Sequence, residues 1–575
     1  MKKVLSNFGV YKKEAILAPL CKLLEASLEL LIPIIVSNII DNGIANSDKG
    51  YIIRMVLIMV LCGFVGLGFS ILGQYFSAKC AVGFATKLRG DLFRKLQSLS
   101  FSEIDTLGTS SMITRMTSDV NQVQTGINLS LRLLLRSPFV VFGAAIMGTI
   151  LAPSISYVYW IAIPVLSVVI FGIIFITMPL HKQTQESLDN VLGDTRENLA
   201  GTRVVRAFTM EEDEIINYSK KVKKLEKNQN KASNISNLMN PLTYIIINVA
   251  IVLLIYLGAI RVNVGDLTQG QVIALYNYMS QILVELIKLA NLIITIAKAI
   301  ACAKRIEKVL DIDTILKQGN DDFINDNYIQ YNHVTLTYKG ASEPSLEDIN
   351  FTVKHGETIG IIGSTGSGKS SVVHLLPRFY EATEGEVLLD GRDITSYDID
   401  ELRNRIGIVM QKAVLFEGTI RDNIKWGKKD ATDEEILKAC EISQSMDIIN
   451  KKEKGIDSCV EQNGRNFSGG QKQRLSIARA LVRKPEILIL DDSSSALDYA
   501  TDAALRKAIK SLDYNPTVFI VSQRTASIQN ADKILVLDDG KMVGFDTHEN
   551  LLKNCETYKE IYYSQFKKGG SNNEK

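Results

Sequence analysis

The sequence has few residues of the kinds that bind metals or form disulfide bonds. Its five histidines and seven cysteines form no CxxC pair and no metal-ligand spacing; the cysteines are at 21, 62, 80, 302, 440, 459 and 555. We therefore expect buried or membrane-embedded thiols in a reducing compartment, and no disulfide or zinc site. Charge of either sign is also not in excess, with 65 Lys and Arg against 63 Asp and Glu, so nucleic acid is not indicated as a partner.

Long apolar runs are what the sequence does have. The 44 residues of Ser137–Leu180 contain no charged side chain, which as helix is about 66 Å, or two crossings of a hydrocarbon core of about 30 Å. Pro153 interrupts this run. Four more apolar stretches are found at Ala15–Ile40, Met55–Ala78, Ala232–Ile260 and Leu267–Val284, the last continuing to about Ile300. We predict six membrane spans, with both chain termini on one side of the bilayer.

The distribution of Lys and Arg predicts on which side of the bilayer the two chain termini lie. Lys79–Leu131 and His181–Asn240 contain 6 and 10 Lys and Arg residues, far more than the other connections between spans. Because positive loops stay cytoplasmic, both termini and the second half of the chain are expected in the cytoplasm of a multi-pass cell-membrane protein. A cleavable signal peptide is not expected, because the first apolar segment is too long and carries acidic residues. The two basic segments are rich in helix formers, so we predict membrane helices that extend well into the cytosol.

The character of the sequence changes near residue 315. We predict a transmembrane domain at 1–315, a linker at 316–327, a nucleotide-binding domain at 328–566 and a disordered tail at 567–575. In the third of these, β-branched and aromatic runs alternate with helical patterns, which predicts an α/β fold with a mostly parallel sheet. The expected strands are 328–338, 358–362, 386–389, 406–410, 487–490, 518–521 and 533–537.

A glycine-rich loop follows one of these strands and opens an apolar helix. It reads Gly363, Ser364, Thr365, Gly366, Ser367, Gly368, Lys369 and Ser370. Glycines let such a loop wrap so that backbone N–H groups face phosphate oxygens, while the lysine supplies charge and the last serine a magnesium ligand. Downstream, the apolar strand 487–490 ends at Asp491, the carboxylate expected opposite such a loop as a magnesium partner. The sequence therefore predicts a site for ATP and Mg²⁺.

Between the loop and Asp491 lies a second motif, Ser468, Gly469, Gly470 and Gln471, which opens a basic helix at Lys472–Leu481. With it, nearly the whole chain resembles an ATP-binding cassette (ABC) exporter half-transporter, in which six membrane spans are fused to one nucleotide-binding domain. The resemblance implies a second half-transporter as partner. Two nucleotide-binding domains would then enclose two ATP molecules, each held by the phosphate loop of one domain and the signature motif of the other.

The resemblance also implies roles for further residues. Tyr338 matches the aromatic residue that stacks on adenine, Ser371 extends the phosphate loop, and Gln411 matches the glutamine that senses magnesium and the γ-phosphate. Ser495–Asp498 matches the loop that crosses the dimer interface. The two cytosolic coupling segments are expected within 101–115 and at 206–208.

Three positions depart from the family pattern. The catalytic glutamate that follows the magnesium aspartate is replaced by Asp492, the histidine that contacts the γ-phosphate by Gln523, and a glutamate before the signature by Gln462. A shift of about 1 Å can cost on the order of 10²-fold in rate, and loss of a general base about 10² to 10⁴. The pattern favours the degenerate subunit of a heterodimer whose signature motif completes the competent site of its partner. An active homodimer with slow hydrolysis is the alternative.

Charged residues within the spans raise a question about substrate. Glu25 and Glu29 share one helix face and Lys22 precedes them, which at membrane depth would indicate a cavity lining, although the cytosolic end of the first span is an equally simple place for them. Glu285, Lys288 and Lys298 are expected in a cytosolic extension of the last span. A small hydrophobic or amphipathic substrate is expected, with an ATP-gated channel or ligand-sensing receptor as the alternative; an importer is disfavoured because both domains are fused.

Overall fold

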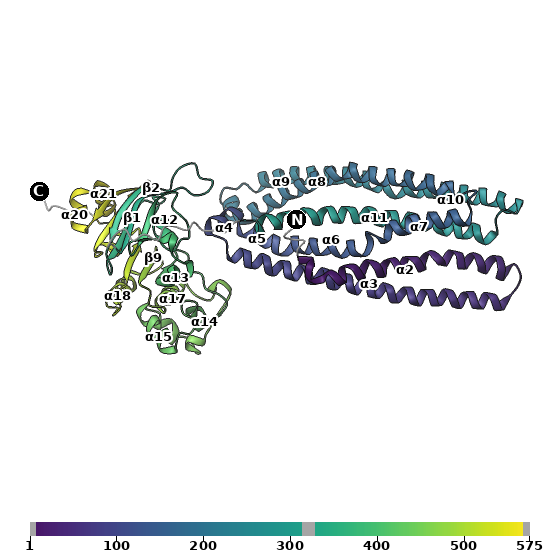
Figure 1. The fold of residues 1–575 in the computed structure, drawn as a ribbon. Coiled ribbons are helices and arrows are strands. Elements are labelled where there is room, and N and C mark those ends of the chain that lie inside the picture. Colours follow the sequence, from purple (N-terminus) through teal and green to yellow (C-terminus); the bar gives the residue numbers. More distant parts are fainter. Residues whose placement is uncertain (1–6, 313–327, 567–575) are drawn as a thin grey trace. The chain divides into compact units, whose positions relative to one another are not determined.

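A computed structural model describes residues 7–312 and 328–566, which belong to two compact units. The helical unit contains the chain up to Ser98 and Thr109–Ile312, and the nucleotide unit contains Leu99–Gly108 together with the chain from Asp313 onward. The predicted linker and tail lie outside the described residues. Figure 1 shows the order of the elements along the chain.

Among its described residues, the helical unit contains six stretches that are long and apolar enough to cross a membrane, which is the predicted number of spans. They are Phe8–Ile44, Lys49–Gln97, Thr109–Leu151, Tyr157–Ala207, Glu211–Val264 and Gln269–Leu310. The component helices are η1 (Asn7–Tyr11), α2 (Lys12–Asn38), η2 (Ile39–Ile44), α3 (Lys49–Gln97), α5 (Thr109–Thr114), η3 (Arg115–Asp119), α6 (Val120–Leu133), α7 (Arg136–Leu151), α8 (Tyr157–Ala207), α9 (Glu211–Asn237), α10 (Met239–Val264) and α11 (Gln269–Leu310).

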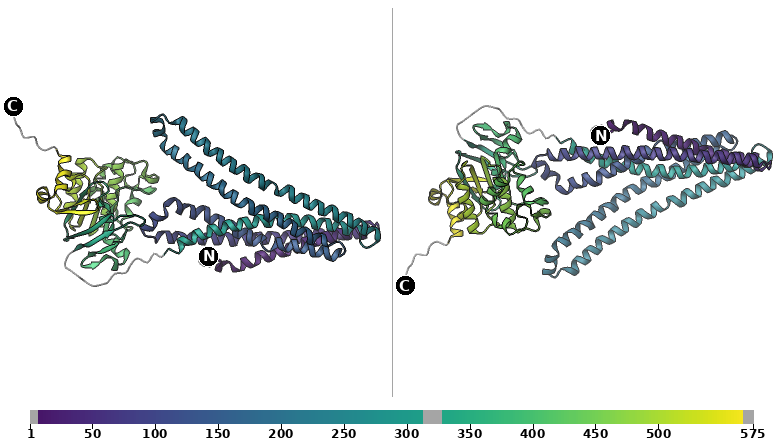
Figure 2. Two further views of the ribbon diagram at one scale, coloured as in Figure 1. Left: turned by 90° about the horizontal axis from the view of Figure 1, so that it is seen from above. Right: turned by 90° about the horizontal axis from the view of Figure 1, so that it is seen from below.

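Several helices are much longer than a bilayer requires, as expected from the basic segments. The 51 residues of α8 correspond to about 77 Å of helix, more than twice the thickness of a hydrocarbon core. Within the helical unit, α8 and α9 run side by side, and their shared end diverges from α2, α3 and α6 (Figure 2). At that end Phe208, in the expected second coupling segment, is 74% exposed.

The nucleotide unit is built on a ten-stranded sheet with the order β5-β4-β1-β2-β12-β11-β3-β10-β9-β6. Its strands are β1 (Ile329–Leu336), β2 (Leu346–Val353), β3 (Thr358–Gly363), β4 (Glu384–Leu389), β5 (Arg392–Asp393), β6 (Ile406–Val409), β9 (Ile487–Asp491), β10 (Thr517–Val521), β11 (Lys533–Asp538) and β12 (Lys541–Asp546); β7 (Gly418–Thr419) and β8 (Cys459–Val460) pair separately. Five of the nine pairings between neighbouring strands are parallel: that of β2 with β12, and the four along β11, β3, β10, β9 and β6. The strands β1, β2, β4 and β5 are antiparallel neighbours, as are β11 and β12.

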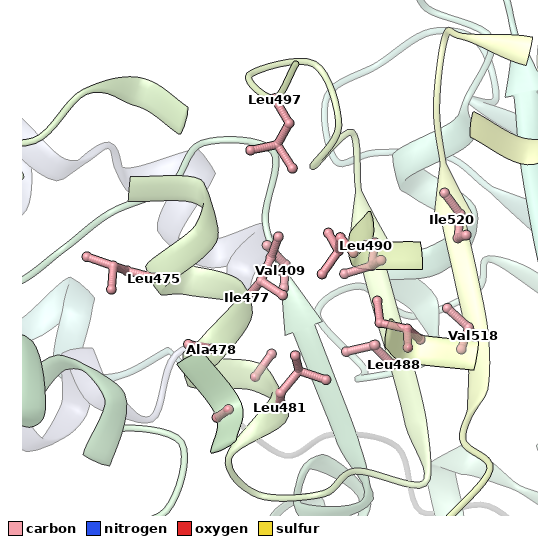
Figure 3. Packing of buried hydrophobic residues seen from close by; sticks show 14 of the residues in the cluster. Val409, Leu475, Ile477, Ala478, Leu481, Leu488, Leu490, Leu497, Val518 and Ile520 are labelled. Carbon is pink, nitrogen blue, oxygen red and sulfur yellow. The ribbon is translucent and has the colours of Figure 1, made fainter. Parts of the chain in front are cut away.

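Helices complete the unit around this sheet. They are α4 (Phe101–Leu107), α12 (Lys369–Leu375), η4 (Ile394–Ser396), α13 (Ile399–Arg405), α14 (Ile420–Lys425), α15 (Asp433–Ile442), α16 (Met446–Asn450), η5 (Gly455–Asp457), η6 (Gln462–Gly464), α17 (Gly469–Leu481), α18 (Tyr499–Lys510), α19 (Thr525–Ile528), α20 (His548–Asn554) and α21 (Glu556–Gln565). One apolar core joins α17 to the parallel strands: Leu475, Ile477 and Leu481 of the helix share a cluster with Leu488 and Leu490 of β9 (Figure 3). This core fixes the signature helix relative to the strand that ends at Asp491.

Candidate nucleotide site

The glycine-rich loop connects β3 to α12, as its sequence predicts. Gly366 and Gly368 have φ values of +89° and +88°, in the left-handed region that favours glycine. A Cβ atom on Gly368 would come within 2.6 Å of the Ser345 carbonyl oxygen, whereas one on Gly366 would meet nothing within 4 Å. The loop therefore needs glycine at 368 for space as well as for φ, and it remains open beside Gly366.

The last two residues of the loop, Lys369 and Ser370, open α12, and Ser370 faces the end of β9. Ser370 Oγ donates a hydrogen bond of 2.7 Å to Asp491 Oδ1, and Asp491 is 1% exposed. Lys369 Nζ donates to the carbonyl oxygens of Gly363 and Ser364, at 3.1 and 2.5 Å. Burial lowers the pKa of Lys369, while the Asp492 and Asp491 carboxylates counteract this. An anionic phosphate at this place would offset the same burial cost.

These residues border a cavity of about 340 Å³ in the nucleotide unit. It is lined by Tyr338, Ser345, Thr365, Gly366, Gly368, Lys369, Ser370, Ser371, Gln411, Asp492, Val521, Ser522 and Gln523. Of the fourteen residues that the sequence assigns to the chain's own ATP site, ten line this cavity; the lining does not include Gly363, Ser364, Ser367 and Asp491. Beside it, the buried Ser367 Oγ has no hydrogen-bond partner within the described chain, and a phosphate oxygen would supply one.

The donor set also suits magnesium. Ser370, Asp491 and Gln411 offer hydroxyl, carboxylate and amide oxygens, the ligand types that Mg²⁺ prefers. Within residues 7–312 and 328–566, no group of three or more His, Cys, Asp or Glu side chains could hold a metal ion. A magnesium ion at this place would be held by one or two protein ligands together with phosphates.

The aromatic end of the cavity is formed by Tyr338, which follows β1. Its hydroxyl hydrogen-bonds Ser371 Oγ at 2.8 Å, and its ring meets the ring of Tyr380 edge to face, with centroids 4.9 Å apart and an interplanar angle of 88°. Burial raises the pKa of Tyr338, although the bond to Ser371 opposes this. The side chain is therefore a neutral aromatic surface fixed next to the phosphate loop.

The two altered positions lie on the same cavity. Asp492 has a left-handed φ of +46°, and its Oδ2 accepts a 3.3 Å hydrogen bond from Gln411 Nε2. Burial is the largest influence on the Asp492 carboxyl and raises its pKa, an effect to which Asp491 adds and which Gln411 opposes. The backbone carbonyl of the exposed Gln523 accepts a hydrogen bond from Gln565 Nε2, at 2.7 Å.

The signature motif lies outside this cavity. Ser468 caps α17: its Oγ accepts from the Gln471 N–H at 3.3 Å, and its own N–H donates to Gln471 Oε1 at 3.0 Å. Ser468 and Gly469 are exposed, and Gly470 packs so closely that a Cβ there would lie 2.8 Å from the Ala496 carbonyl oxygen. The motif is the exposed N-terminus of a helix, a suitable place for an anion.

Two residues of this region were not identified from the sequence. His374 Nε2 lies 3.2 Å from Asp491 Oδ2, and Tyr380 contacts Tyr338 as described above. A signal for His374 does exist: it is four residues after Ser370 and so lies on the same face of α12. Tyr380 lies in an irregular segment, and no periodicity points to it.

The charged residues of the spans form an ion-pair cluster within the helical unit, which the sequence did not predict. Arg136 donates to Glu285 Oε1 at 2.7 Å and to Glu29 Oε2 at 2.6 Å. Glu285 also accepts from Lys288 and from Ser137 Oγ, both at 2.7 Å, and is 3% exposed. Glu285 is therefore a buried ion-pair partner of Arg136, which lies on another helix. Glu25 pairs separately, with Lys22 at 2.6 Å.

The thiols are mostly buried, as expected. All seven cysteines are free; Cys21, Cys80, Cys302, Cys440 and Cys555 are buried and Cys62 is half-buried. Cys459, in β8, is exposed and is the exception.

Six spans, a phosphate loop facing a strand-end aspartate and a separate Ser-Gly-Gly-Gln helix cap together define a membrane ATPase of the ABC type. Two family models match the chain: "ABC transporter transmembrane region" over residues 15–286 and "ABC transporter" over residues 346–495. The chain belongs to the ABC transporter family and is a half-transporter, with the membrane domain and the ATP-binding domain in one polypeptide.

Comparisons with individual proteins also identify ABC transporters as relatives. The chain is 34% identical to the uncharacterized ABC transporter ATP-binding protein YfiB of Bacillus subtilis, over 99% of this chain and 100% of that protein. It is 31% identical to an ATP-dependent lipid A-core flippase of Hahella chejuensis, over 90% and 89% of the two chains. A solved bacterial Atm1-family ABC exporter with ATP bound has the same fold, with a TM-score of 0.82 over 98% of this chain and 100% of that one, at 23% identity.

Proposed function

We propose that this chain is one subunit of a heterodimeric ATP-driven exporter, and that its own ATP site binds nucleotide but hydrolyses it slowly or not at all. The observation that carries the proposal is the cavity in which an intact phosphate loop meets Asp492 and Gln523. Binding groups are complete there, whereas both hydrolytic positions are altered.

The chemistry of Asp492 supports slow hydrolysis. Its carboxylate is one methylene shorter than that of the glutamate usual at this position, and its direction is held by the bond from Gln411. A general base must reach the water that it activates, and a shortfall of about 1 Å costs on the order of 10²-fold. Burial raises the pKa of Asp492, but a more basic carboxylate does not make up for its greater distance from the attacking water.

The neutral Gln523 also lacks a charge that would assist hydrolysis. A glutamine can hydrogen-bond a γ-phosphate oxygen but cannot carry the positive charge that a protonated histidine brings to a developing anion. Bound Mg²⁺, for which Ser370, Asp491 and Gln411 are the candidate ligands, would neutralise phosphate charge. Nucleotide binding is thus attributed mainly to the phosphate loop, Tyr338 and the candidate magnesium ligands, and slow hydrolysis to Asp492 and Gln523.

The exposed signature motif supports the role in a partner's site. Ser468 and Gly469 face solvent in this chain and take no part in its own cavity, so a phosphate from a second nucleotide-binding domain can approach the α17 N-terminus. Binding of two ATP molecules would close the two domains and open the membrane cavity outward; hydrolysis at the partner's site would reset the cycle.

The proposed location is supported by the charges between the spans, and the proposed substrate by a relative. The excess of Lys and Arg in 79–131 and 181–240 supports a cytoplasmic location for the nucleotide unit and both termini. The substrate is proposed to be hydrophobic or amphipathic and lipid-like, supported by the 31% identity to a protein named a lipid A-core flippase.

The experiment compares magnesium-dependent ATP hydrolysis by the purified chain alone with that of the chain co-purified with its partner half-transporter. We expect very low turnover from the chain alone and a sharp rise with the partner. Comparable turnover by the chain alone would instead indicate an active homodimer.

A further inference from the structure

The last helix of the nucleotide unit, α21, contacts a short segment beside the nucleotide cavity through its final residue, Gln565. Gln565 Oε1 accepts hydrogen bonds from the backbone N–H and the hydroxyl of Thr525, at 2.9 and 3.0 Å. Gln565 Nε2 donates to the backbone carbonyl of Gln523 at 2.7 Å. One amide group therefore holds the segment 523–525, which lies between β10 and α19, at both of its ends.

These bonds supply partners that the segment does not provide itself. The first N–H groups of a helix have no partner within that helix. The helix α19 begins at Thr525, and Arg524, its N-cap residue, makes no side-chain capping bond. Thr525 is buried, so water has little access to its N–H. Gln565 therefore caps α19 from a position 40 residues further along the chain.

The segment 523–525 also borders the nucleotide cavity. Gln523 lines that cavity and is exposed, so packing does little to fix the direction of its side chain. Arg524 Nη1 donates to the carbonyl oxygens of Ser494 and Leu497 at 3.4 and 3.3 Å, which are longer bonds than that of Gln565 to the Gln523 carbonyl. The Gln565 amide is thus the closer restraint on this backbone, and the backbone determines which directions the Gln523 side chain can take.

We propose that Gln565 is a positioning residue: it holds the backbone of Gln523 so that the Gln523 side chain meets the terminal phosphate of ATP, and the preference of this site for ATP over ADP depends on it. The inference rests on the proposed function, because it requires that this cavity bind ATP. The Gln523 amide can donate a hydrogen bond to a phosphate oxygen, and hydrogen bonds to charged acceptors are the stronger ones. ADP lacks that phosphate, so a misdirected Gln523 weakens the binding of ATP and leaves the binding of ADP nearly unchanged.

The role assigned to Gln565 is indirect. Its side chain is exposed at the end of α21 and is not part of the cavity lining, so its effect on a nucleotide passes through the segment 523–525. The phosphate loop and Tyr338 belong to other segments of the unit. The helix α21 would therefore influence the contact with the terminal phosphate and not the contacts that ATP and ADP share.

Four variants separate positioning from folding. Gln565→Ala removes all three hydrogen bonds, and Gln565→Glu keeps the acceptor for Thr525 but loses the donor for the Gln523 carbonyl. Thr525→Val removes only the hydroxyl bond. Ser564→Ala is the matched control, because Ser564 is the exposed neighbour of Gln565 in α21 and its hydroxyl donates to the Ile561 carbonyl of the same helix, at 2.7 Å.

The test uses the full-length chain in lipid nanodiscs. The dissociation constants of Mg-ADP and of the non-hydrolysable ATP analogue Mg-AMPPNP are measured by titration, and their ratio gives the preference. The wild type, Ser564→Ala and Thr525→Val are expected to bind the analogue more tightly than ADP. In Gln565→Ala and Gln565→Glu the preference should fall about tenfold or more, as for the loss of one hydrogen bond to a charged group, while the affinity for ADP stays unchanged.

A double-variant cycle shows whether Gln565 acts through Gln523. Gln523→Ala alone should lower the preference as far as Gln565→Ala does. Adding Gln565→Ala to Gln523→Ala should then lower the preference no further, because the two residues act on one contact. Additive losses would overturn the inference, since Gln565 would then act by another route.

Three other results would overturn the inference alone. The wild type could bind the analogue no more tightly than ADP, or Gln565→Ala could keep the preference of the wild type. Gln565→Ala could also weaken the binding of both nucleotides equally, which is what a purely structural role would cause. Failure of the wild type to bind either nucleotide would overturn the proposed function and this inference with it.

Discussion

Replacing Arg136 by Met tests the ion-pair cluster of the helical unit. Arg136 bridges Glu285, which is 3% exposed, and Glu29, whose side chain is 38% exposed. Removing one partner of a buried ion pair typically costs about 3–5 kcal/mol, because an uncompensated charge remains. Since Glu285 keeps Lys288 and Ser137 as donors, we expect the loss in the free energy of unfolding at the lower end of this range, about 3 kcal/mol.

The matched control is Glu29→Gln, which removes the exposed partner and leaves the Arg136–Glu285 pair intact. That change should cost only about 0–1 kcal/mol, as for exposed ion pairs. The double variant Arg136→Met with Glu285→Gln should recover part of the loss, since no unpaired buried carboxylate remains. The assay is thermal unfolding of the full-length protein in detergent at fixed pH and salt. Equal midpoint shifts for Arg136→Met and Glu29→Gln, or no recovery in the double variant, would refute the reasoning.

Three further predictions concern the nucleotide unit. Ser468→Ala should strongly reduce ATP turnover of the complex with the partner, whereas Asp492→Asn should change it little; equal losses in the steady-state assay would contradict the division of roles. Gly368→Ala should abolish ATP binding without unfolding the protein, because its φ of +88° is strained for alanine and its Cβ would lie 2.6 Å from the Ser345 carbonyl oxygen; circular dichroism and nucleotide titration together check this. Lys369→Ala should weaken nucleotide retention about tenfold or more, as expected for loss of a charged hydrogen bond, and a filter-binding assay would detect the change.

Local sequence patterns predicted the parts of the fold that depend on short segments. The six spans follow from apolar length, and the phosphate loop follows from residues 363–370, where glycine spacing and the flanking strand and helix are contiguous. Continuous apolar runs also predicted five strands to within a residue or two at each end: β3, β6, β9, β10 and β11. The strands β2 and β12 were not predicted: in β2, polar residues separate the buried apolar ones, so it lacks a continuous apolar run.

Contacts between distant segments could not be predicted in the same way. Arg136 and Glu285 are 149 residues apart, and only the packing of α7 on α11 brings them together. Gln523 and Gln565 are 42 residues apart, so no spacing rule relates them. Glu29 could be assigned to a helix face from sequence, but its partner could not, because pairing across helices depends on their relative rotation.

The most direct test of the central claim is single-turnover ATP hydrolysis by the heterodimer in which the partner's catalytic glutamate is changed to glutamine, so that only this chain's site can report. We expect bound ATP to remain unhydrolysed at this site over many turnover times of the unmodified complex. We also expect Asp492→Glu combined with Gln523→His to restore measurable hydrolysis there. Hydrolysis at the unmodified site as fast as in the whole complex would show that the site is not degenerate.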